Sequence, residues 1–300
     1  MKEKELIKVI KQELNSNYIG DDCAYIKNLG IVITQDNLVE DVHFSMKYIS
    51  PYELGYKSAM VNLSDIAASG GKAECLTVGL SIPNNLDKTF VKDFYNGMKL
   101  ACKGVEIVGG DITGAEKIFI SVTALGTSKG RKISSRSNAK IGQKICVSGL
   151  HGSSAAGLRI LNNRNLDKEN KFVKAHLTPV ARLDISENIG KNTNYDYAMM
   201  DTSDGLGEAL FAISEKSNVK LVVDFDKIPY DKDLEKFENW QDMILFGGED
   251  YELVATLFDA PCGMNVIGEV QEGFGVEINY GNITKTLTND ELFAKTYNHF

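Results

Sequence analysis

The sequence predicts an α/β or α+β fold with two domains. Segments of strand composition alternate with segments of helical periodicity along the whole chain, as in such folds. Residues 128–142 are rich in Lys, Arg, Ser and Gly and separate this alternation into two halves. A chain of 300 residues is long enough for two domains and a sizeable core. We therefore expect one domain over residues 1–130 and a second α/β domain over residues 131–300.

The elements expected in the first half begin with a helix. Residues 1–14 alternate Lys and Glu with Leu and Ile at helical spacing, which predicts an amphipathic helix and not a signal peptide. A Gly-Asp-Asp turn then leads into a strand within residues 19–26. Further strands are expected at residues 30–36, 74–83, 105–111 and 117–126, with an amphipathic helix at residues 86–103.

The most informative of these segments is residues 56–71, which have the small and apolar composition of a buried helix and end in two glycines. Four polar residues recur in it at steps of four, three and four, so they share one helix face: Ser58, Asn62, Asp65 and Ser69. A buried lone carboxylate is costly unless something neutralises it. For this helix alone, a structural aspartate bonded to nearby backbone explains the pattern equally well.

The second half repeats the alternation. Strands are expected at residues 144–148, 198–201, 219–225, 252–257, 266–270 and 275–280. A glycine turn at residues 149–152 leads into a helix, residues 179–190 have a helical pattern, and one or two further helices follow. Residues 162–171 are polar and are expected to form a surface insertion.

Composition limits the classes of function. The net charge of −8 argues against nucleic acid or an anionic membrane surface as the main partner. It leaves anionic substrates open, because metal cations can bridge two negative partners. The five cysteines form no CxxC or Cys/His pattern, which predicts reduced thiols in a cytoplasmic protein. No apolar run is long enough to span a membrane.

Six aspartates lie at expected strand ends or on the polar helix face, most of them next to Gly, Ser or Thr: Asp22, Asp36, Asp65, Asp111, Asp201 and Asp204. A single aspartate in such a place is usually a turn former or a helix cap. Six together would repel one another unless cations intervene, and short carboxylates suit Mg²⁺ that is shared with substrate phosphates. The pattern therefore favours a magnesium and phosphate site.

The familiar ATP-binding motifs are absent from the sequence, which has neither a GxxxxGK[ST] loop nor the protein-kinase motifs. The Gly109-Gly110 and Gly247-Gly248 pairs are able to bring backbone N–H groups close to phosphate oxygens, although such pairs are common in plain turns. No Ser-His or Cys-His spacing indicates a nucleophile, and His43 and Ser203 have no spacing signature. The other three histidines are expected to be ordinary surface or core residues: His151, His176 and His299.

A set of motifs adds a resemblance to a known family. Gly-Asp-Asp-Cys-Ala begins at Gly20, Thr-Gln-Asp-Asn-Leu-Val-Glu-Asp-Val-His-Phe at Thr34, and Met-Val-Asn-Leu-Ser-Asp-Ile-Ala at Met60. Asp-Thr-Ser-Asp-Gly-Leu follows at Asp201, and Gly-Gly-Glu-Asp-Tyr-Glu-Leu at Gly247. In this combination and order, the chain resembles the thiamine-monophosphate kinase family, within the aminoimidazole-ribonucleotide-synthetase-like superfamily, over nearly its whole length.

The resemblance implies a fold and an activity. The expected fold has an N-terminal α/β domain whose sheet pairs with its mate in a homodimer, and a C-terminal α/β domain that completes the site. The expected activity is Mg²⁺-dependent, direct in-line transfer of the ATP γ-phosphoryl group to thiamine monophosphate, with several Mg²⁺ ions. The acceptor phosphate is already ionised at neutral pH, so no catalytic base is expected.

Residue roles are carried over from the family by position. The expected metal ligands are the six aspartates above with Thr34 and Gln35, the latter through its backbone carbonyl. The expected nucleotide contacts are Tyr95, Gly109, Gly110, Arg136 and Ser203. The expected thiamine-phosphate contacts are His43, Glu249 and the aromatic Tyr297.

The chain departs from the family pattern at several positions. Gln35 stands where the family usually has Thr, Asp41 replaces a usual Gly, and Ile112 replaces a usual Thr. His151 also changes the usual Gly-Asp-Ser turn. None of these changes removes a carboxylate, so they bear on the positioning of the substrate and not on the class of reaction.

Two alternatives remain open. One is another ATP-dependent enzyme of the superfamily, such as a purine-pathway cyclase or selenophosphate synthetase. The latter is disfavoured, because it would want a reactive Cys ahead of a Lys near the N-terminus, whereas Cys23 lies within the Gly-Asp-Asp motif. The other alternative is a non-catalytic protein that binds nucleotide or Mg²⁺ on the same fold.

Overall fold

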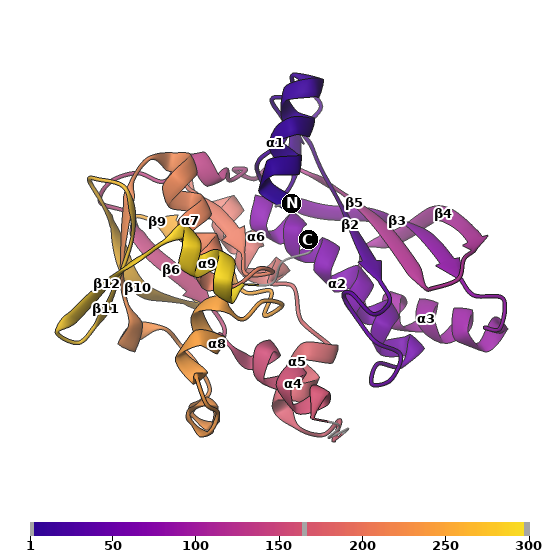
Figure 1. Ribbon diagram of the computed structural model, residues 1–300. Coiled ribbons are helices and arrows are strands. Elements are labelled where there is room, and N and C mark those ends of the chain that lie inside the picture. Colours follow the sequence, from indigo (N-terminus) through magenta and orange to yellow (C-terminus); the bar gives the residue numbers. More distant parts are fainter. Residues whose placement is uncertain (1–2, 164–166, 297–300) are drawn as a thin grey trace.

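The computed structural model describes residues 3–163 and 167–296, which form two mixed β-sheets with helices packed on them (Figure 1). The strands of the first sheet come from residues 24–127 and those of the second from residues 144–287. The long helix α2 (Pro51–Ser69) runs between the two halves of the molecule. The α/β and α+β prediction is therefore confirmed, while the boundary at residue 130 remains a prediction.

The first sheet has five strands in the order β1 (Ala24–Ile26), β2 (Ile31–Val39), β5 (Phe119–Thr127), β3 (Lys72–Ile82) and β4 (Glu106–Gly114). Neighbouring strands are antiparallel except for β3 and β4, which are parallel. Alternate residues of β5, from Ile120 to Ala124, are buried, as expected for a strand with one covered face. The opposite face is only partly covered within this chain.

Helices α2 and α3 (Lys88–Ala101) pack closely beside this sheet. Glycines allow the two helices to pack closely against each other. A Cβ at Gly55 would lie 1.9 Å from the Phe94 carbonyl oxygen, and a Cβ at Gly97 would lie 1.8 Å from the Tyr52 carbonyl oxygen. Helix α1 (Glu3–Leu14) stands apart at the top of Figure 1. Its predicted amphipathic pattern leaves Ile10 and Leu14 exposed.

The second sheet has seven strands in the order β12 (Ile283–Leu287), β11 (Gly275–Tyr280), β8 (Lys220–Asp224), β10 (Met264–Gln271), β6 (Lys144–Ser148), β9 (Leu253–Leu257) and β7 (Met199–Asp201). Its core includes the buried face of helix α7 (Leu206–Ser217) and residues of α8 (Trp240–Phe246). Shorter helices complete this half: α4 (Ser153–Asn162), α5 (Lys171–Leu177), α6 (Leu183–Asn192) and α9 (Asn289–Lys295).

Helix α2 joins the two halves because both sides of it are buried. Its C-terminal end packs Ala67 and Ala68 against Ile189 of α6 and Tyr197 beside β7. Conversely, apolar residues of α4 and α5 in the second half, such as Leu161 and Val173, pack into the core of the first half. The two cores are therefore in contact along α2.

Most of the expected elements exist, with shifted ends. Helix α2 ends as predicted, with Gly70 in a left-handed conformation (φ 78°), but it begins at Pro51, five residues before the predicted start. Ser50 and Glu53 form a capping box there, a sequence signal that the prediction missed. The short elements α5, β12 and α9 were also not predicted individually. Within the described residues, no helix is long and apolar enough to cross a membrane.

A candidate metal and phosphate site

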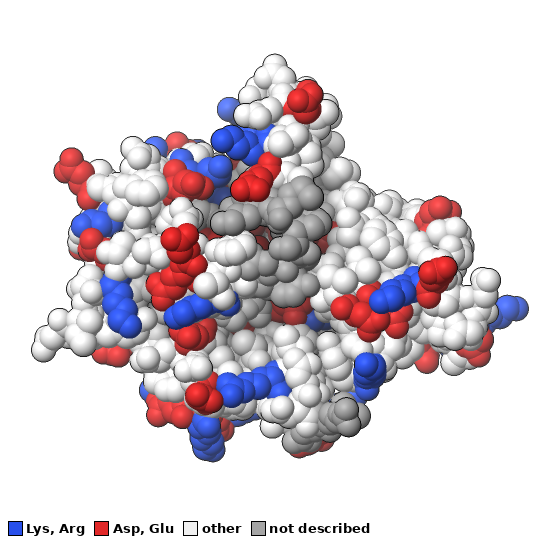
Figure 2. Space-filling view, in the orientation of Figure 1, with Lys and Arg blue, Asp and Glu red and all other residues white. Residues whose placement is uncertain are grey.

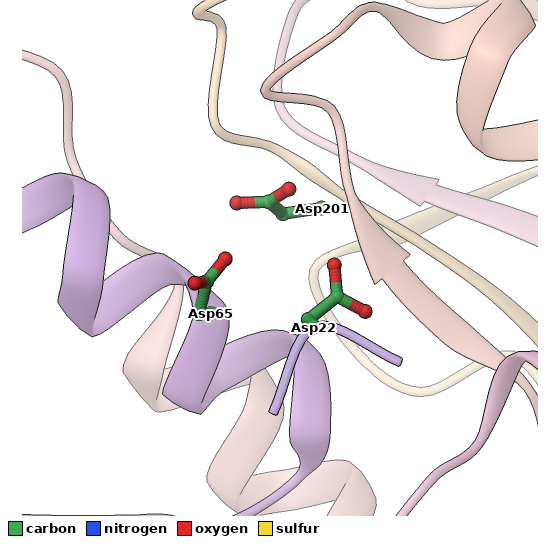
Figure 3. A group of neighbouring side chains, drawn as sticks. All are labelled: Asp22, Asp65 and Asp201. Carbon is green, nitrogen blue, oxygen red and sulfur yellow. The ribbon is translucent and has the colours of Figure 1, made fainter. Parts of the chain in front are cut away.

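Three carboxylates meet where the two halves face each other. Asp22, Asp65 and Asp201 each offer an oxygen, and these oxygens all lie within 4.8 Å of one another. The three side chains come from three separate segments and point toward a common centre (Figure 3). We call Asp22, Asp65 and Asp201 the carboxylate cluster.

Hydroxyl groups orient two members of the cluster. The Thr34 hydroxyl of β2 donates to Asp65 Oδ2 at 2.6 Å, and the Ser64 hydroxyl of α2 donates to Asp201 Oδ2 at 2.6 Å. The Ser203 hydroxyl donates to the other oxygen of Asp201 at 2.8 Å. These neutral donors fix the carboxylates without cancelling their charge.

Asp22 has a charged partner, because Arg136 Nη2 lies 2.9 Å from its Oδ1. The side chain of Asp22 is 5% exposed and that of Arg136 is 21% exposed. The predicted nucleotide contact Arg136 therefore lies at the cluster, and so does Ser203. A guanidinium in this place is suited to phosphate oxygens as well as to the carboxylate.

Burial and mutual repulsion raise the pKa of several carboxyl groups here. Burial, followed by the charges of Asp36 and Asp201, raises the pKa of Asp65 well above its ordinary value. Burial and Asp22 raise the pKa of Asp201 to about 7. Burial, Asp204 and Asp22 raise the pKa of Asp36 to about 6. Asp36 and Asp204 thus belong to the same electrostatic environment, and the whole group would be stabilised by cations.

The polar face of α2 lies toward β2, and only one of its members is a carboxylate available to a metal. Asn62 Oδ1 accepts from the Asp36 backbone N–H at 3.1 Å. The Ser58 and Ser69 hydroxyls donate to backbone carbonyls of the same helix. These contacts leave Asp65 as the member of the face that meets the other carboxylates.

The structure separates Gln35 from the cluster. Thr34 and Asp36 share one face of β2, while Gln35 points to the opposite face, where the Thr123 hydroxyl donates to its Oε1 at 2.9 Å. The Gln35 side chain therefore lies away from the carboxylates, and the expected role of its backbone carbonyl remains a prediction.

Asp111, Gly109 and Gly110 lie on the edge strand β4. Asp36 pairs with Val122, Val122 with Val78, and Val78 with Gly110, so three strand spacings separate β2 from β4. At about 4.8 Å for each spacing, Asp111 lies roughly 14 Å from the strand of Asp36. Gly110 must lack a side chain, since a Cβ would lie 1.9 Å from the Val78 carbonyl oxygen. Asp111 is exposed and is not brought into the cluster of its own chain.

Tyr95 is also placed away from the cluster. It lies on α3 with its ring edge-on to Phe94, at a centroid distance of 5.4 Å. This part of α3 packs near Gly55 of α2, ten residues before Asp65. That interval corresponds to about 15 Å along the helix axis.

A second polar group surrounds Glu249. Lys57 Nζ of α2 lies 3.1 Å from Glu249 Oε1, and His176 Nδ1 of α5 lies 3.2 Å from Glu249 Oε2. His43 acts on the Glu249 carboxyl electrostatically, and its Nδ1 accepts from the Val39 backbone N–H at 3.0 Å. Two residues expected to contact thiamine phosphate, His43 and Glu249, are thus brought together.

Sequence reasoning missed Lys57 and the contact made by His176. His176 is a core histidine, as expected, but it touches Glu249, and the Ser154 hydroxyl lies 3.0 Å from the same ring nitrogen. A Ser-His-acid proton relay requires the serine and the acid to contact different ring nitrogens. The trio therefore does not form a nucleophilic triad.

The family departures have separate explanations. Asp41 has φ 63°, a left-handed conformation in which glycine is unstrained and aspartate is tolerated, and it pairs with Lys117 at 2.8 Å. Ile112 is exposed on β4, away from the cluster. His151 is a fully buried core residue. Tyr297 lies outside the described residues.

Surface charges contrast with the cluster. Figure 2 shows Lys and Arg side chains interspersed with Asp and Glu side chains over one face of the molecule. Several of them are exposed pairs, such as Lys295 with Asp242 at 3.0 Å. Exposed pairs contribute little to stability. The carboxylates bonded to neutral hydroxyls, Asp65 and Asp201, are the more informative ones.

Comparisons with known proteins identify relatives of this chain. The family model described as "AIR synthase related protein, N-terminal domain" matches residues 20–128. Thiamine-monophosphate kinase of Aquifex aeolicus is 36% identical over 290 residues, covering 91% of this chain and 93% of that protein. Thiamine-monophosphate kinase of Bacillus subtilis is 37% identical over 253 residues, covering 80% of this chain and 77% of that protein.

The chain is also similar to solved structures. The structure described as "AaThiL complexed with AMPPCP and TMP" has a TM-score of 0.88 at 35% identity and covers 100% of this chain and 97% of that chain. A chain of the HypE–HypF complex shares the fold, with a TM-score of 0.78 at 20% identity, covering 94% of this chain and 98% of that one. With 36% identity over nearly the full length of a curated relative, the protein belongs to the thiamine-monophosphate kinase family.

Proposed function

We propose that this protein transfers the γ-phosphoryl group of ATP to the phosphate of thiamine monophosphate, giving thiamine diphosphate and ADP. The names of its relatives and the nucleotide analogue and TMP in the AaThiL structure support this activity. The observation that carries the proposal is the convergence of three carboxylates from three segments within 4.8 Å. Such a cluster suits divalent cations that bind phosphates.

The donor set fits Mg²⁺. The three side chains offer hard carboxylate oxygens. Burial and then the repulsion of neighbouring carboxylates raise the pKa values of Asp65 and Asp201, and bound cations would remove that repulsion. Asp22, Asp65 and Asp201, with Asp36 and Asp204 beside them, would hold several ions. Bound Mg²⁺ would neutralise charge on the phosphate oxygens of the two substrates.

The residues of the chain provide positioning in this mechanism. Arg136, 2.9 Å from Asp22, offers a guanidinium to the nucleotide phosphates, and His43 and Glu249 receive the thiamine end. The bond between the γ-phosphorus and its bridging oxygen breaks, its electron pair leaves with ADP, and an oxygen of thiamine monophosphate forms the new bond. No group has to remove a proton from the acceptor, so direct in-line transfer needs only alignment and charge neutralisation.

A homodimer is part of the proposal. Val108 and Ile112 are exposed on the edge strand β4, and the open face of the first sheet is only partly covered. Asp111 lies too far from Asp36 to join the metal site of its own chain, so it would reach the site of a second copy. We also retain the two domains and the cytoplasmic location as proposals, the latter supported by five unpaired cysteines.

The decisive experiment is turnover of ATP with thiamine monophosphate, followed by separation of thiamine diphosphate from the reactants. Product formation that requires both substrates and Mg²⁺ is expected. A protein that binds ATP and Mg²⁺ but forms no thiamine diphosphate would be a non-catalytic binder or an enzyme with another acceptor. Thiamine itself is the matched control acceptor, because it lacks the phosphate.

A further inference from the structure

We propose that Lys57 is a positioning residue that holds the Glu249 carboxylate as an acceptor for the amino group of the substrate's pyrimidine ring. This inference rests on the proposed function, because it names a part of thiamine monophosphate. It assigns a role to a residue of α2 outside the polar face that contains Asp65. The argument depends on the burial of Lys57, its partner, and the charge balance around Glu249.

Lys57 is 1% exposed, which is unusual for a lysine without a special reason. Its ammonium nitrogen lies 3.1 Å from Glu249 Oε1. Burying an ammonium group is costly unless a carboxylate compensates it, so this pair is mutually dependent. Glu249 itself is 27% exposed, which leaves part of its carboxylate accessible to a ligand.

The backbone of Glu249 is held in an uncommon conformation. Its φ is 65°, and its N–H donates to the Ser203 carbonyl oxygen at 2.7 Å. Non-glycine residues in the left-handed region persist where the surroundings hold them, and such positions are frequent in ligand sites. Lys57 from α2 and His176 from α5 fix the side chain from two directions.

The charges around Glu249 determine what it recognises. Burial and the charge of Lys57 lower the pKa of His176 to about 3, so its ring is neutral at pH 7. Lys57 and Glu249 then cancel each other, and the remaining neighbours from other segments are His43 and Tyr48. A carboxylate balanced in this way favours a hydrogen-bond donor over a bare cation. In thiamine monophosphate, the pyrimidine amino group is such a donor.

The spacing on α2 matches an elongated substrate. Lys57 and Ser64 are seven residues apart and therefore share a face, about 10 Å apart along the helix axis. Ser64 contacts Asp201 of the carboxylate cluster, while Lys57 contacts Glu249. A substrate with a phosphate at one end and an amino group at the other can therefore span the two contacts.

The test compares Lys57→Met, Glu249→Gln and the double variant with the unmodified protein, using ATP and thiamine monophosphate. Each single variant is expected to raise the KM for thiamine monophosphate by about tenfold or more. The KM for ATP should change by less than about twofold. If Lys57 acts through Glu249, the double variant should be no worse than Glu249→Gln, since the two residues serve one contact.

Two further readouts separate positioning from a merely structural role. The double variant contains no unpaired buried charge, so its melting temperature should recover relative to Glu249→Gln while its KM does not. Oxythiamine monophosphate, which lacks the amino group, should be discriminated against by the unmodified protein and not by either single variant.

Lys72→Met is the matched control, because Lys72 pairs with Glu74 at 2.9 Å but is 51% exposed. It follows the C-terminal end of α2, which lies about 18 Å along the helix axis from Lys57. Its kinetics should be unchanged. Equal rises in both KM values or additive effects in the double variant would overturn the role of Lys57. Absence of turnover by the unmodified protein would instead refute the proposed function, and with it the substrate named here.

Discussion

The hydroxyl of Ser64 donates a hydrogen bond of 2.6 Å to Asp201, although the two residues are 137 positions apart in the sequence. Both side chains are buried. Ser64 belongs to α2 and Asp201 ends β7, so this contact fixes a carboxylate of the second half against the central helix of the first. The geometry of the carboxylate cluster therefore depends on the docking of the two halves.

Ser64→Ala is expected to weaken Mg²⁺ binding without unfolding the protein. The lost hydrogen bond frees one oxygen of Asp201 and removes an interaction that favours its charged form. Loss of a group that orients a ligand typically costs ten- to a hundredfold in metal affinity, so the half-saturating Mg²⁺ concentration should rise about tenfold. Measurement of rate against Mg²⁺ at saturating ATP checks this. An unchanged Mg²⁺ dependence would show that Asp201 does not depend on Ser64.

Asp65→Asn is expected to abolish turnover and to leave the fold intact. Asp65 is the member of the cluster that α2 supplies, and an amide is a much poorer Mg²⁺ ligand than a carboxylate. Without metal, the variant should melt at a higher temperature than the unmodified protein, because a neutral amide removes the cost of burying a charge and then the repulsion from Asp36 and Asp201. Steady-state kinetics and calorimetry test both parts. Asp226→Asn, at an exposed position, serves as the control, and near-normal turnover of Asp65→Asn would make Asp65 a structural residue.

The metal-free protein is expected to lose stability as pH rises from 5 to 8. Asp36 and Asp201 have pKa values of about 6 and about 7 in the folded protein, above the ordinary value of 3.8. The folded state therefore retains protons that the unfolded chain releases. The resulting stabilisation is complete below pH 3.8 and is lost as pH passes through 6 and 7.

Melting curves in EDTA and in Mg²⁺ measure this effect. The rise in melting temperature produced by Mg²⁺ should grow from pH 5 to pH 8, because protons and cations compete for the same carboxylates. Asp201→Asn should show a smaller change with pH in EDTA than the unmodified protein. Identical pH profiles for the two proteins would contradict the assignment to Asp201.

Much of the site could be predicted from local sequence patterns. Aspartates at strand ends and on a helix face predicted the convergence of Asp22, Asp65 and Asp201, since strand ends and helix faces direct side chains in known ways. The alternation of side chains along β2 was also sufficient to place Gln35 on the face opposite Thr34 and Asp36. The prediction did not use that alternation.

The remaining features depend on contacts between distant segments. Lys57 lies between Tyr56 and Ser58 in the sequence, and only the docking of the loop that contains Glu249 shows why a lysine is buried there. The distance of Asp111 from the cluster follows from strand order and register, which one-dimensional patterns do not determine. The same limit explains why the contact between His176 and Glu249 was not predicted.

His151→Leu is expected to stabilise the protein. His151 is fully buried, and neither of its ring nitrogens makes a hydrogen bond of good geometry within the described residues, although the Ser148 backbone lies nearby. Relief of an unsatisfied polar side chain should contribute about 1 kcal/mol at pH 7. Burial lowers the pKa of His151 to about 4, so the unfolded chain binds a proton between pH 6.5 and 4 that the folded state does not. The advantage of the variant should therefore increase as pH falls through that range.

Urea unfolding of His151→Leu at pH 7 and pH 5 measures this prediction. The difference in free energy of unfolding between variant and unmodified protein should be larger at pH 5. Turnover should be unchanged, because His151 touches neither the carboxylate cluster nor Glu249. A variant less stable than the unmodified protein at both pH values would show that the imidazole packs better than leucine in this place.

The last prediction concerns Asp111 and the dimer. In each chain, Asp111 lies on β4, about 14 Å from the strand of Asp36, so the proposal requires it to act in the site of a second copy. Asp65→Asn and Asp111→Asn homodimers should both be inactive. A dimer with one chain of each kind has one site with both substitutions and one site with neither.

If the chains mix at random, half of the dimers are mixed, and each has one intact site of two. The mixture should therefore regain about a quarter of the activity of the unmodified protein. Light scattering should show dimers throughout, and mixing after brief dissociation provides the exchange. A monomer at micromolar concentration, or a mixture that stays inactive although its chains exchange, would show that Asp111 does not act in the site of a second copy.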